Sequence, residues 1–127
     1  MLGAPIQIYK VIMNLVLNAA EAMPVGGQIM IATENRRLCE DLNAFEQVGA
    51  GDYAVITVAD TGVGIASEDL EKIFEPFFTK KKLGRSGSGL GMAVVWGTVK
   101  DHQGFVDVQS SVGRGTTFTI FLPALKD

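Results

Sequence analysis

A carboxylate followed by two glycines is the part of this sequence best suited to bind a small ligand. Asp60 ends the apolar run Tyr53–Ala59, and Gly62 and Gly64 follow it in the segment DTGVGI. An ionised carboxylate only accepts hydrogen bonds, and glycines let the backbone approach a flat ligand because they have no Cβ. Adenine presents an exocyclic amine where guanine presents an acceptor. Such a carboxylate therefore predicts a site that prefers ATP to GTP, with an ordinary β-turn aspartate as the alternative interpretation.

A second glycine cluster stands at the start of a helical pattern and consists of Gly87, Ser88, Gly89, Leu90, Gly91 and Met92. Backbone N–H groups at a helix N-terminus form a natural anion site. The G-x-G-x-G spacing differs from the dinucleotide fingerprint, and the Lys-Ser/Thr ending of a Walker A loop is absent. The preceding segment carries the cations Lys80, Lys81, Lys82 and Arg85, which could fold over a triphosphate or simply form a solvated loop.

Two asparagines interrupt the apolar helical pattern near the start of the chain. Asn14 and Asn18 lie four residues apart and Glu21 follows, so the three share one helix face. Carboxamides are costly to bury without partners, and an asparagine carbonyl is a suitable ligand for Mg²⁺ that is held mostly by phosphates. Local capping of the backbone or plain exposure is the alternative. Further on, Thr116 could support Asp60 from a neighbouring strand, or could be an ordinary strand threonine.

The composition is that of one globular domain. The 127 residues are 47% hydrophobic and 20% charged, which excludes a disordered chain. The net charge of −3 argues against a general nucleic-acid surface. The single cysteine, Cys39, cannot form an internal disulfide and suits a reducing compartment, and the apolar stretches are too short to span a membrane. We therefore expect a cytoplasmic, monomeric domain that contacts neither membrane nor nucleic acid.

Hydrophobic periodicity and turn signals predict an α+β fold. The predicted helices cover residues 6–23, 67–74 and 88–102, and the predicted strands cover 28–33, 53–59, 105–109 and 116–122. The polar stretch 34–51, which contains Cys39, is predicted to be a long hairpin connection. Paired strands with helices between them indicate a two-layer α/β sandwich, in which a mixed, mostly antiparallel sheet is covered by about three helices.

Capping signals are present at two of the predicted helix ends. Ser67 is the N-cap candidate of the second helix, and acidic residues follow it in the first turn. Gly104 is predicted to end the third helix as a glycine C-cap. His102 would lie near the negative end of that helix dipole, which suits a partly positive ring.

Five motifs occur in an order that is typical of one ATPase family. They are NLVLNA at 14–19, DTGVGI at 60–65, FEPFF at 74–78, GSGLG at 87–91 and GTTF at 115–118. With these motifs the chain resembles the ATP-binding catalytic domain of bacterial sensor histidine kinases, in the wider gyrase, heat-shock-protein-90, histidine-kinase and mismatch-repair ATPase superfamily. The resemblance covers nearly the whole of residues 1–127. The segments FFTK and VVWG are similar to the nitrogen-regulation and PAS-hybrid branch of these kinases.

The resemblance implies a Bergerat-type ATP-binding fold and a role for each motif. Asn18 would be the Mg²⁺ ligand, Asn14 would join it in the catalytic site, and Asp60 would anchor adenine. Residues 75–86 would form the lid over ATP. The remaining ATP contacts would come from Gly62, Gly64, Ile65, Phe77, Thr79, Lys80, Lys81, Gly87, Ser88, Gly89, Leu90, Gly91, Met92 and Thr116.

The resemblance also implies the reaction and its partners. The γ-phosphoryl group of ATP would pass to a histidine on a separate dimerisation domain, and then to an aspartate on a response regulator. His102 does not match that acceptor histidine, so we expect this chain to bind ATP without phosphorylating itself. Many relatives carry a basic residue where this sequence has Glu21, so either the lid cations would contribute more to phosphate binding or the affinity for ATP would be lower.

Three other functions compete with this interpretation. An ATP-driven clamp needs a general base, usually a glutamate where Asn14 stands, and an amide cannot accept that proton. A non-catalytic nucleotide-binding module acting in docking or regulation is the second alternative, although none of the motifs is broken. The third is a serine kinase acting on an anti-anti-sigma partner, which the FEPFF motif and the long hairpin connection argue against.

Overall fold

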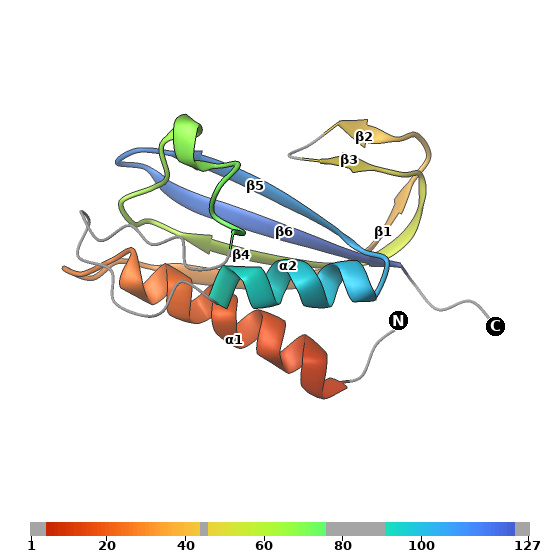
Figure 1. Cartoon of the computed structure of the whole chain (residues 1–127), viewed down its shortest axis with the longest axis horizontal. Coiled ribbons are helices and arrows are strands. Elements are labelled where there is room, and N and C mark those ends of the chain that lie inside the picture. Colours follow the sequence, from red (N-terminus) through yellow and green to blue (C-terminus); the bar gives the residue numbers. More distant parts are fainter. Residues whose placement is uncertain (1–4, 44–45, 76–90, 124–127) are drawn as a thin grey trace.

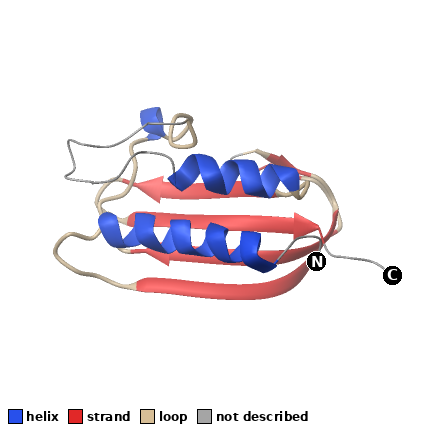
Figure 2. Cartoon of the chain, turned by 60° about the horizontal axis from the view of Figure 1, so that its bottom comes forward, coloured by secondary structure: helices blue, strands red, loops and turns tan. Residues whose placement is uncertain are grey.

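A four-stranded antiparallel sheet with two helices on one face forms the body of the protein (Figure 1). The computed structural model describes residues 5–43, 46–75 and 91–123. The strand order is β1-β4-β6-β5, and a small hairpin of β2 and β3 lies on the sheet face away from the helices. Figure 2 shows α1 and α2 side by side over the sheet. The predicted α+β two-layer sandwich is therefore confirmed, and every strand pair in the described residues is antiparallel.

The elements follow one another in the predicted order, apart from two short strands within the connection predicted for residues 34–51. They are α1 (Pro5–Glu21), β1 (Ile29–Leu38), β2 (Leu42–Asn43), β3 (Gln47–Val48), β4 (Gly51–Asp60), the short 3-10 helix η1 (Ser67–Asp69), α2 (Gly91–Asp101), β5 (Phe105–Ser111) and β6 (Gly115–Pro123). None of the helices in the described part of the chain is long and apolar enough to cross a membrane.

The main core lies between the sheet and the two helices. Because side chains alternate along a strand, Ile56 and Val58 of β4 face the helices, where Leu15 of α1 and Val99 of α2 are fully buried. A second cluster of Val48, Tyr53, Val55 and Phe121 packs under the β2–β3 hairpin on the opposite face. The core thus holds α1, α2 and β4 in fixed relation at the end of β4, where Asp60 lies.

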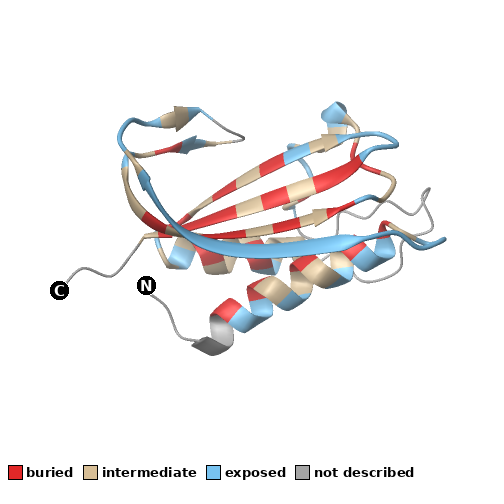
Figure 3. Ribbon diagram, turned by 180° about the vertical axis from the view of Figure 1, so that it is seen from behind, coloured by how far each residue is buried: buried red, intermediate tan, exposed pale blue. Residues whose placement is uncertain are grey.

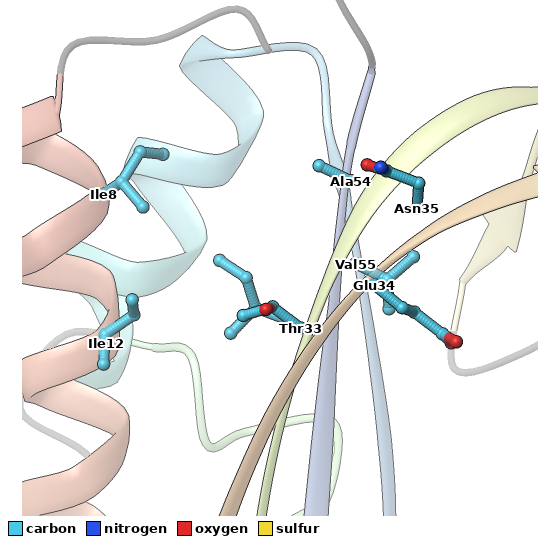
Figure 4. A pocket seen from close by; sticks show the side chains of 8 residues that line it. Ile8, Ile12, Thr33, Glu34, Asn35, Ala54 and Val55 are labelled. Carbon is cyan, nitrogen blue, oxygen red and sulfur yellow. The ribbon is translucent and has the colours of Figure 1, made fainter.

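Strand β1 is a long, exposed edge. Nine of its ten residues are exposed (Figure 3), and Arg37 forms an ion pair with Asp52 on β4, at 2.7 Å between Nε and Oδ1. The hydrogen bond and charge of Asp52 raise the pKa of Arg37 above its ordinary value. Charged side chains on an edge strand discourage pairing with other chains. Between this strand and α1 lies a groove of about 360 Å³, where Ile8 and Ile12 face Thr33 (Figure 4).

Two sequence-based boundaries were wrong. The strand predicted for residues 28–33 continues to Leu38, so the connection to β4 is shorter and contains the β2–β3 hairpin. Cys39 lies in this connection, as predicted, and is exposed. The helix predicted for 67–74 is only the 3-10 helix η1 followed by turns, and Ser67 provides no side-chain cap. Its hydrogen bonds join residues three apart, such as Lys72 N to Asp69 O at 2.9 Å. A segment this short cannot offset the cost of α-helix nucleation.

The end of α2 also differs in detail from the prediction. Gln103, not Gly104, adopts the left-handed conformation, with φ of 59°. The Gly104 N–H donates to the Val99 carbonyl at 2.8 Å, which completes a Schellman motif. Glycine is needed at 104 because a Cβ there would lie 2.5 Å from the Phe121 carbonyl oxygen. His102 Nδ1 lies 2.7 Å from the Thr98 carbonyl oxygen, so its predicted position at the helix end is confirmed.

Alkaline pH should expose the contribution of Tyr53 to stability. Burial, aided by the charge of Asp41, raises the pKa of Tyr53 above its ordinary value of 10.0. The neutral phenol is thus favoured in the folded state, and its stabilisation is complete below pH 10 and is lost as pH rises through the folded-state pKa. We expect Tyr53→Phe to lower the free energy of unfolding by about 1 kcal/mol at pH 8, where the hydroxyl donates to Gly49 O, and by less above pH 10.

Urea unfolding at pH 8 and pH 10.5 measures this difference. The exposed Tyr9→Phe serves as the matched control. A Tyr53→Phe deficit that is the same at both pH values would contradict the expectation.

Candidate functional site

Asp60 and Thr116 lie side by side at one end of the sheet. Asp60 is the last residue of β4 and its Cα partner on β6 is Thr116, whose own partner on β5 is Ser110. Directly opposed residues in antiparallel strands project to the same face, so the three polar side chains form a row across three strands. Asp60 and Thr116 are both buried, at 7% and 3% exposed. The predicted position of Thr116 on the strand beside Asp60 is confirmed.

The Asp60 carboxylate is held by the loop that follows it. Its Oδ1 accepts a hydrogen bond from the Gly62 N–H at 2.8 Å, which forms an Asx turn. The turn interpretation of this aspartate is therefore correct. Within the described part of the chain, this carboxylate accepts its hydrogen bond, from Gly62, at Oδ1. The second oxygen, Oδ2, is then the atom that can meet a ligand, and its direction is fixed by the turn.

Glycine is required at Gly62 and Gly64 because the loop passes very close to other backbone. A Cβ at Gly62 would lie 2.4 Å from the Ala22 carbonyl oxygen, at the end of α1. A Cβ at Gly64 would lie 2.1 Å from the Ser111 carbonyl oxygen, and its φ of 77° is in the left-handed region. These glycines therefore let the loop fit between α1 and the β5–β6 turn, rather than only admitting a ligand.

The two asparagines lie on the face of α1 that leads to this loop. Asn14 Nδ2 donates to the Lys10 carbonyl at 2.9 Å, as the local-capping alternative proposed. Its Oδ1 lies beside Gly91, where an added Cβ would be 3.0 Å away. Asn18 is half-buried one turn before Ala22, whose carbonyl accepts the Val63 N–H at 2.9 Å. The face of α1 that carries Asn14 and Asn18 therefore extends from the start of α2 to the loop that contains Gly62 and Gly64, called the glycine loop below.

Ser110 is a site residue that the sequence analysis missed. Its hydroxyl contacts the Ile65 N–H, the Gly115 carbonyl and the Thr116 hydroxyl, so it joins the glycine loop to β6. Serine is common in strands and turns, and only the strand register places this one beside Thr116. The GTTF motif at 115–118 could have indicated it, because Ser110 is the residue that pairs with Thr116 across the β5–β6 hairpin.

Other predicted contacts take different positions. Ile65 is 2% exposed and belongs to the main core, and Met92 packs against the same core. The groove beside β1 contains none of the predicted site residues. Predicted contacts that lie outside the described residues are Phe77, Thr79, Lys80, Lys81, Gly87, Ser88, Gly89 and Leu90, with most of the lid segment 75–86.

The donor set of the described residues limits the kind of metal site that this end of the sheet can form. No group of three or more His, Cys, Asp or Glu side chains suited to a metal ion occurs among residues 5–43, 46–75 and 91–123. The predicted metal ligand is the Asn18 carboxamide, and the other predicted polar side chains at this end of the described structure are those of Asn14, Asp60 and Thr116. Such a set suits a Mg²⁺ ion that takes most of its ligands from phosphates and water.

The α+β two-layer sandwich, with Asp60 at the end of β4, is the arrangement expected of the ATPase family that the motifs resemble. Residues 3–126 match the family described as histidine kinase-, DNA gyrase B-, and HSP90-like ATPase. The chain belongs to this family. It is 48% identical over 120 residues to the sensor kinase CckA of Brucella abortus, covering 94% of this chain and 13% of CckA. It is 39% identical over 121 residues to the sensor histidine kinase ZraS of Salmonella typhimurium, covering 95% of this chain and 23% of ZraS.

Solved structures agree with this assignment. The catalytic domain of histidine kinase ThkA superposes with a TM-score of 0.70 at 30% identity, covering 95% of this chain and 69% of that structure. The chain therefore corresponds to the catalytic ATPase domain of sensor histidine kinases, as the motifs indicated, and spans less than a quarter of the length of CckA or ZraS.

Gly64→Ala should destabilise the fold strongly. A Cβ at Gly64 combines a left-handed backbone with a 2.1 Å approach to backbone oxygen, so we expect a loss of about 3 kcal/mol or more in the free energy of unfolding. Gly113→Ala is the matched control, because its φ of 83° is similar and nothing lies within 4 Å of the added Cβ. For it we expect a loss of about 1 kcal/mol. Equal losses for the two variants in urea unfolding would show that the close approach at Gly64 does not affect the free energy of unfolding.

Proposed function

We propose that this chain is the Mg·ATP-binding domain of a sensor histidine kinase and donates the γ-phosphoryl group of ATP to a histidine on a separate dimerisation domain. The observation that carries the proposal is the buried Asp60 carboxylate, whose Oδ1 accepts from the Gly62 N–H and which stands opposite Thr116 on the neighbouring strand. Membership of the ATPase family indicates that the ligand is ATP.

In this proposal Asp60 binds the adenine base. Oδ2 accepts a hydrogen bond from the exocyclic amine, and Oδ1 keeps the carboxylate in place through the Gly62 N–H. Burial strengthens such a charged hydrogen bond because water competes less well for the carboxylate. Guanine carries an acceptor at the same position, and two acceptors facing each other in a buried site are unfavourable. The site should therefore distinguish ATP from GTP by the group that faces Asp60, which is an amine in adenine and an oxygen in guanine.

The phosphates extend toward Asn18, Asn14 and the start of α2. The Asn14 carboxamide lies beside Gly91, the first residue of α2, and backbone N–H groups at a helix start attract phosphate oxygens. The Asn18 side-chain carbonyl would hold the Mg²⁺ ion, which neutralises phosphate charge when bound. The predicted lid and the other residues of the second glycine cluster would complete this end of the site.

The transfer requires a partner that supplies the acceptor. The bond between the γ-phosphorus and the β,γ-bridging oxygen breaks, and a bond from an imidazole nitrogen to that phosphorus forms. The chain's own histidine is a poor acceptor, because His102 Nδ1 contacts the Thr98 carbonyl at the far end of α2 from Gly91. The phosphoryl group would then move to an aspartate of a response regulator. A cytoplasmic location fits these partners.

Hydrolysis by this chain should be negligible. A clamp ATPase uses a general base to activate water, and Asn14 donates to Lys10 O and cannot take up a proton at neutral pH. The decisive experiment mixes the chain with labelled ATP and the histidine-bearing dimerisation domain of its parent protein. Phosphohistidine formation is the expected result. ATP binding without any phosphohistidine would favour the non-catalytic docking module, and rapid phosphate release would favour a clamp ATPase.

Asp60→Asn should weaken ATP binding and reduce the preference over GTP. The asparagine oxygen can still accept from the Gly62 N–H, so the turn survives while an NH₂ group replaces Oδ2. We expect about a tenfold to hundredfold loss of ATP affinity, because hydrogen bonds to charged groups contribute about 1.5 to 3 kcal/mol. Titration calorimetry with ATP and GTP measures both values. The exposed Asp101→Asn is the control, and unchanged affinities for Asp60→Asn would rule out the adenine role.

Asn18→Ala should remove the Mg²⁺ dependence of ATP binding. The wild-type chain should bind ATP more tightly with Mg²⁺ than with EDTA, because an oxygen ligand from the protein joins those of the phosphates. In Asn18→Ala the two affinities should converge. Asn43→Ala, at the exposed end of β2, provides the control. Retention of the full Mg²⁺ effect in Asn18→Ala would exclude Asn18 as a ligand.

A further inference from the structure

Ser110 occupies the third place in the row of polar residues at the end of the sheet. It is half-buried on β5, and its Cα partner is Thr116, which in turn partners Asp60. Thr116 therefore stands between Ser110 and Asp60, with all three side chains on the helix-covered face. The hydrogen bond between Ser110 and Thr116 therefore determines whether the Thr116 hydroxyl can donate a hydrogen bond to another group or only accept one.

The Ser110 hydroxyl makes three short polar contacts. The Ile65 N–H donates to Oγ at 2.7 Å, Oγ lies 3.0 Å from the Gly115 carbonyl oxygen, and Oγ lies 2.8 Å from Thr116 Oγ1. The first contact comes from the glycine loop and the other two come from β6. One hydroxyl thus joins the loop that follows Asp60 to the strand that carries Thr116.

Only one arrangement of protons satisfies all three contacts together. The Gly115 carbonyl has no proton, so Ser110 must donate its single proton there. The Ile65 N–H occupies one lone pair of Oγ, and the remaining lone pair can accept only if Thr116 is the donor. The Thr116 proton therefore points toward Ser110, so Thr116 Oγ1 presents only lone pairs to any further group that reaches it.

We propose that Ser110 is a positioning residue that sets the base specificity of the site by holding the Thr116 hydroxyl as a hydrogen-bond acceptor toward the ligand. This inference rests on the proposed binding of a purine nucleotide at Asp60. With Ser110 present, the ligand end of the row offers acceptors from both Asp60 and Thr116, which favours a 6-amino purine. Without Ser110, the Thr116 hydroxyl is free to rotate and to donate to the oxygen of a 6-oxo purine.

The test compares ATP and GTP affinities of Ser110→Ala with those of the wild-type chain by titration calorimetry. We expect ATP affinity to fall about fivefold and GTP affinity to stay unchanged or rise, so that the ATP-to-GTP affinity ratio falls about fivefold or more, the size of a typical hydrogen-bond contribution. Ser110→Thr keeps a hydroxyl on a β-branched residue suited to a strand, and it should restore most of the ratio. Ser111→Ala, exposed on the same strand, should leave both affinities unchanged.

A purely structural Ser110 gives a different result. Loosening of the loop alone would weaken both nucleotides by the same factor, and an unchanged ATP-to-GTP ratio in Ser110→Ala would overturn the inference. If Ser110→Ala does not fold, Ser110→Cys, which replaces the hydroxyl by a weak donor of similar shape, must show the same fall in ratio for the inference to stand.

Coupling to Thr116 gives a second readout. Thr116→Val removes the hydroxyl through which Ser110 acts, so adding Ser110→Ala to Thr116→Val should not change the ratio further. A further fall in the double variant would overturn the inference. A wild-type chain that binds neither nucleotide would overturn the proposed function together with this inference, whereas a wild type that prefers ATP, with an unchanged ratio in Ser110→Ala, would overturn this inference alone.

Discussion

The backbone N–H and carbonyl of Val63 connect the three parts of the molecule on which the site depends, namely the end of α1, the loop after Asp60 and the β5–β6 turn. Its N–H donates to the Ala22 carbonyl at the end of α1, and its carbonyl accepts from the Gly113 N–H in the β5–β6 turn at 2.8 Å. Two backbone hydrogen bonds thus hold the loop after Asp60 between a helix end and a hairpin turn. Because both partners belong to elements packed into one core, the position of the loop follows from the fold rather than from the loop's own sequence.

This arrangement explains why small residues surround the loop. Gly62 passes Ala22 and Gly64 passes Ser111, while Gly115 on β6 has a φ of 98° and would place a Cβ 2.1 Å from the Asp60 carbonyl oxygen. Each contact is between backbone groups that cannot move without shifting an entire strand or helix. The glycines therefore have a packing reason that is independent of any ligand, and the same packing keeps the Asp60 carboxylate in a fixed direction.

Much of this could be predicted from the sequence, and the failures have physical causes. The strand end at Asp60, the strand beside it carrying Thr116 and the asparagine face of α1 follow from periodicity and turn chemistry. The extent of β1 could not be predicted, because an exposed edge strand carries few of the apolar residues that mark a strand. Capping signals alone suggested a helix after Ser67, but too few residues follow to sustain one.

Ser110 could not be identified because its importance depends on register, which joins residues far apart in sequence. Ser110 and Ile65 are 45 residues apart, and the contact between them arises only when β5, β6 and the glycine loop are assembled. The turn and ligand interpretations of Asp60, which stand as alternatives in the sequence, are compatible in the structure. They involve different oxygens: Oδ1 forms the turn with Gly62, and by doing so it fixes where Oδ2 points. The turn is therefore the structural condition for a ligand role, not an argument against it. The same holds for Asn14, whose Nδ2 donates to the Lys10 carbonyl while its Oδ1 faces Gly91.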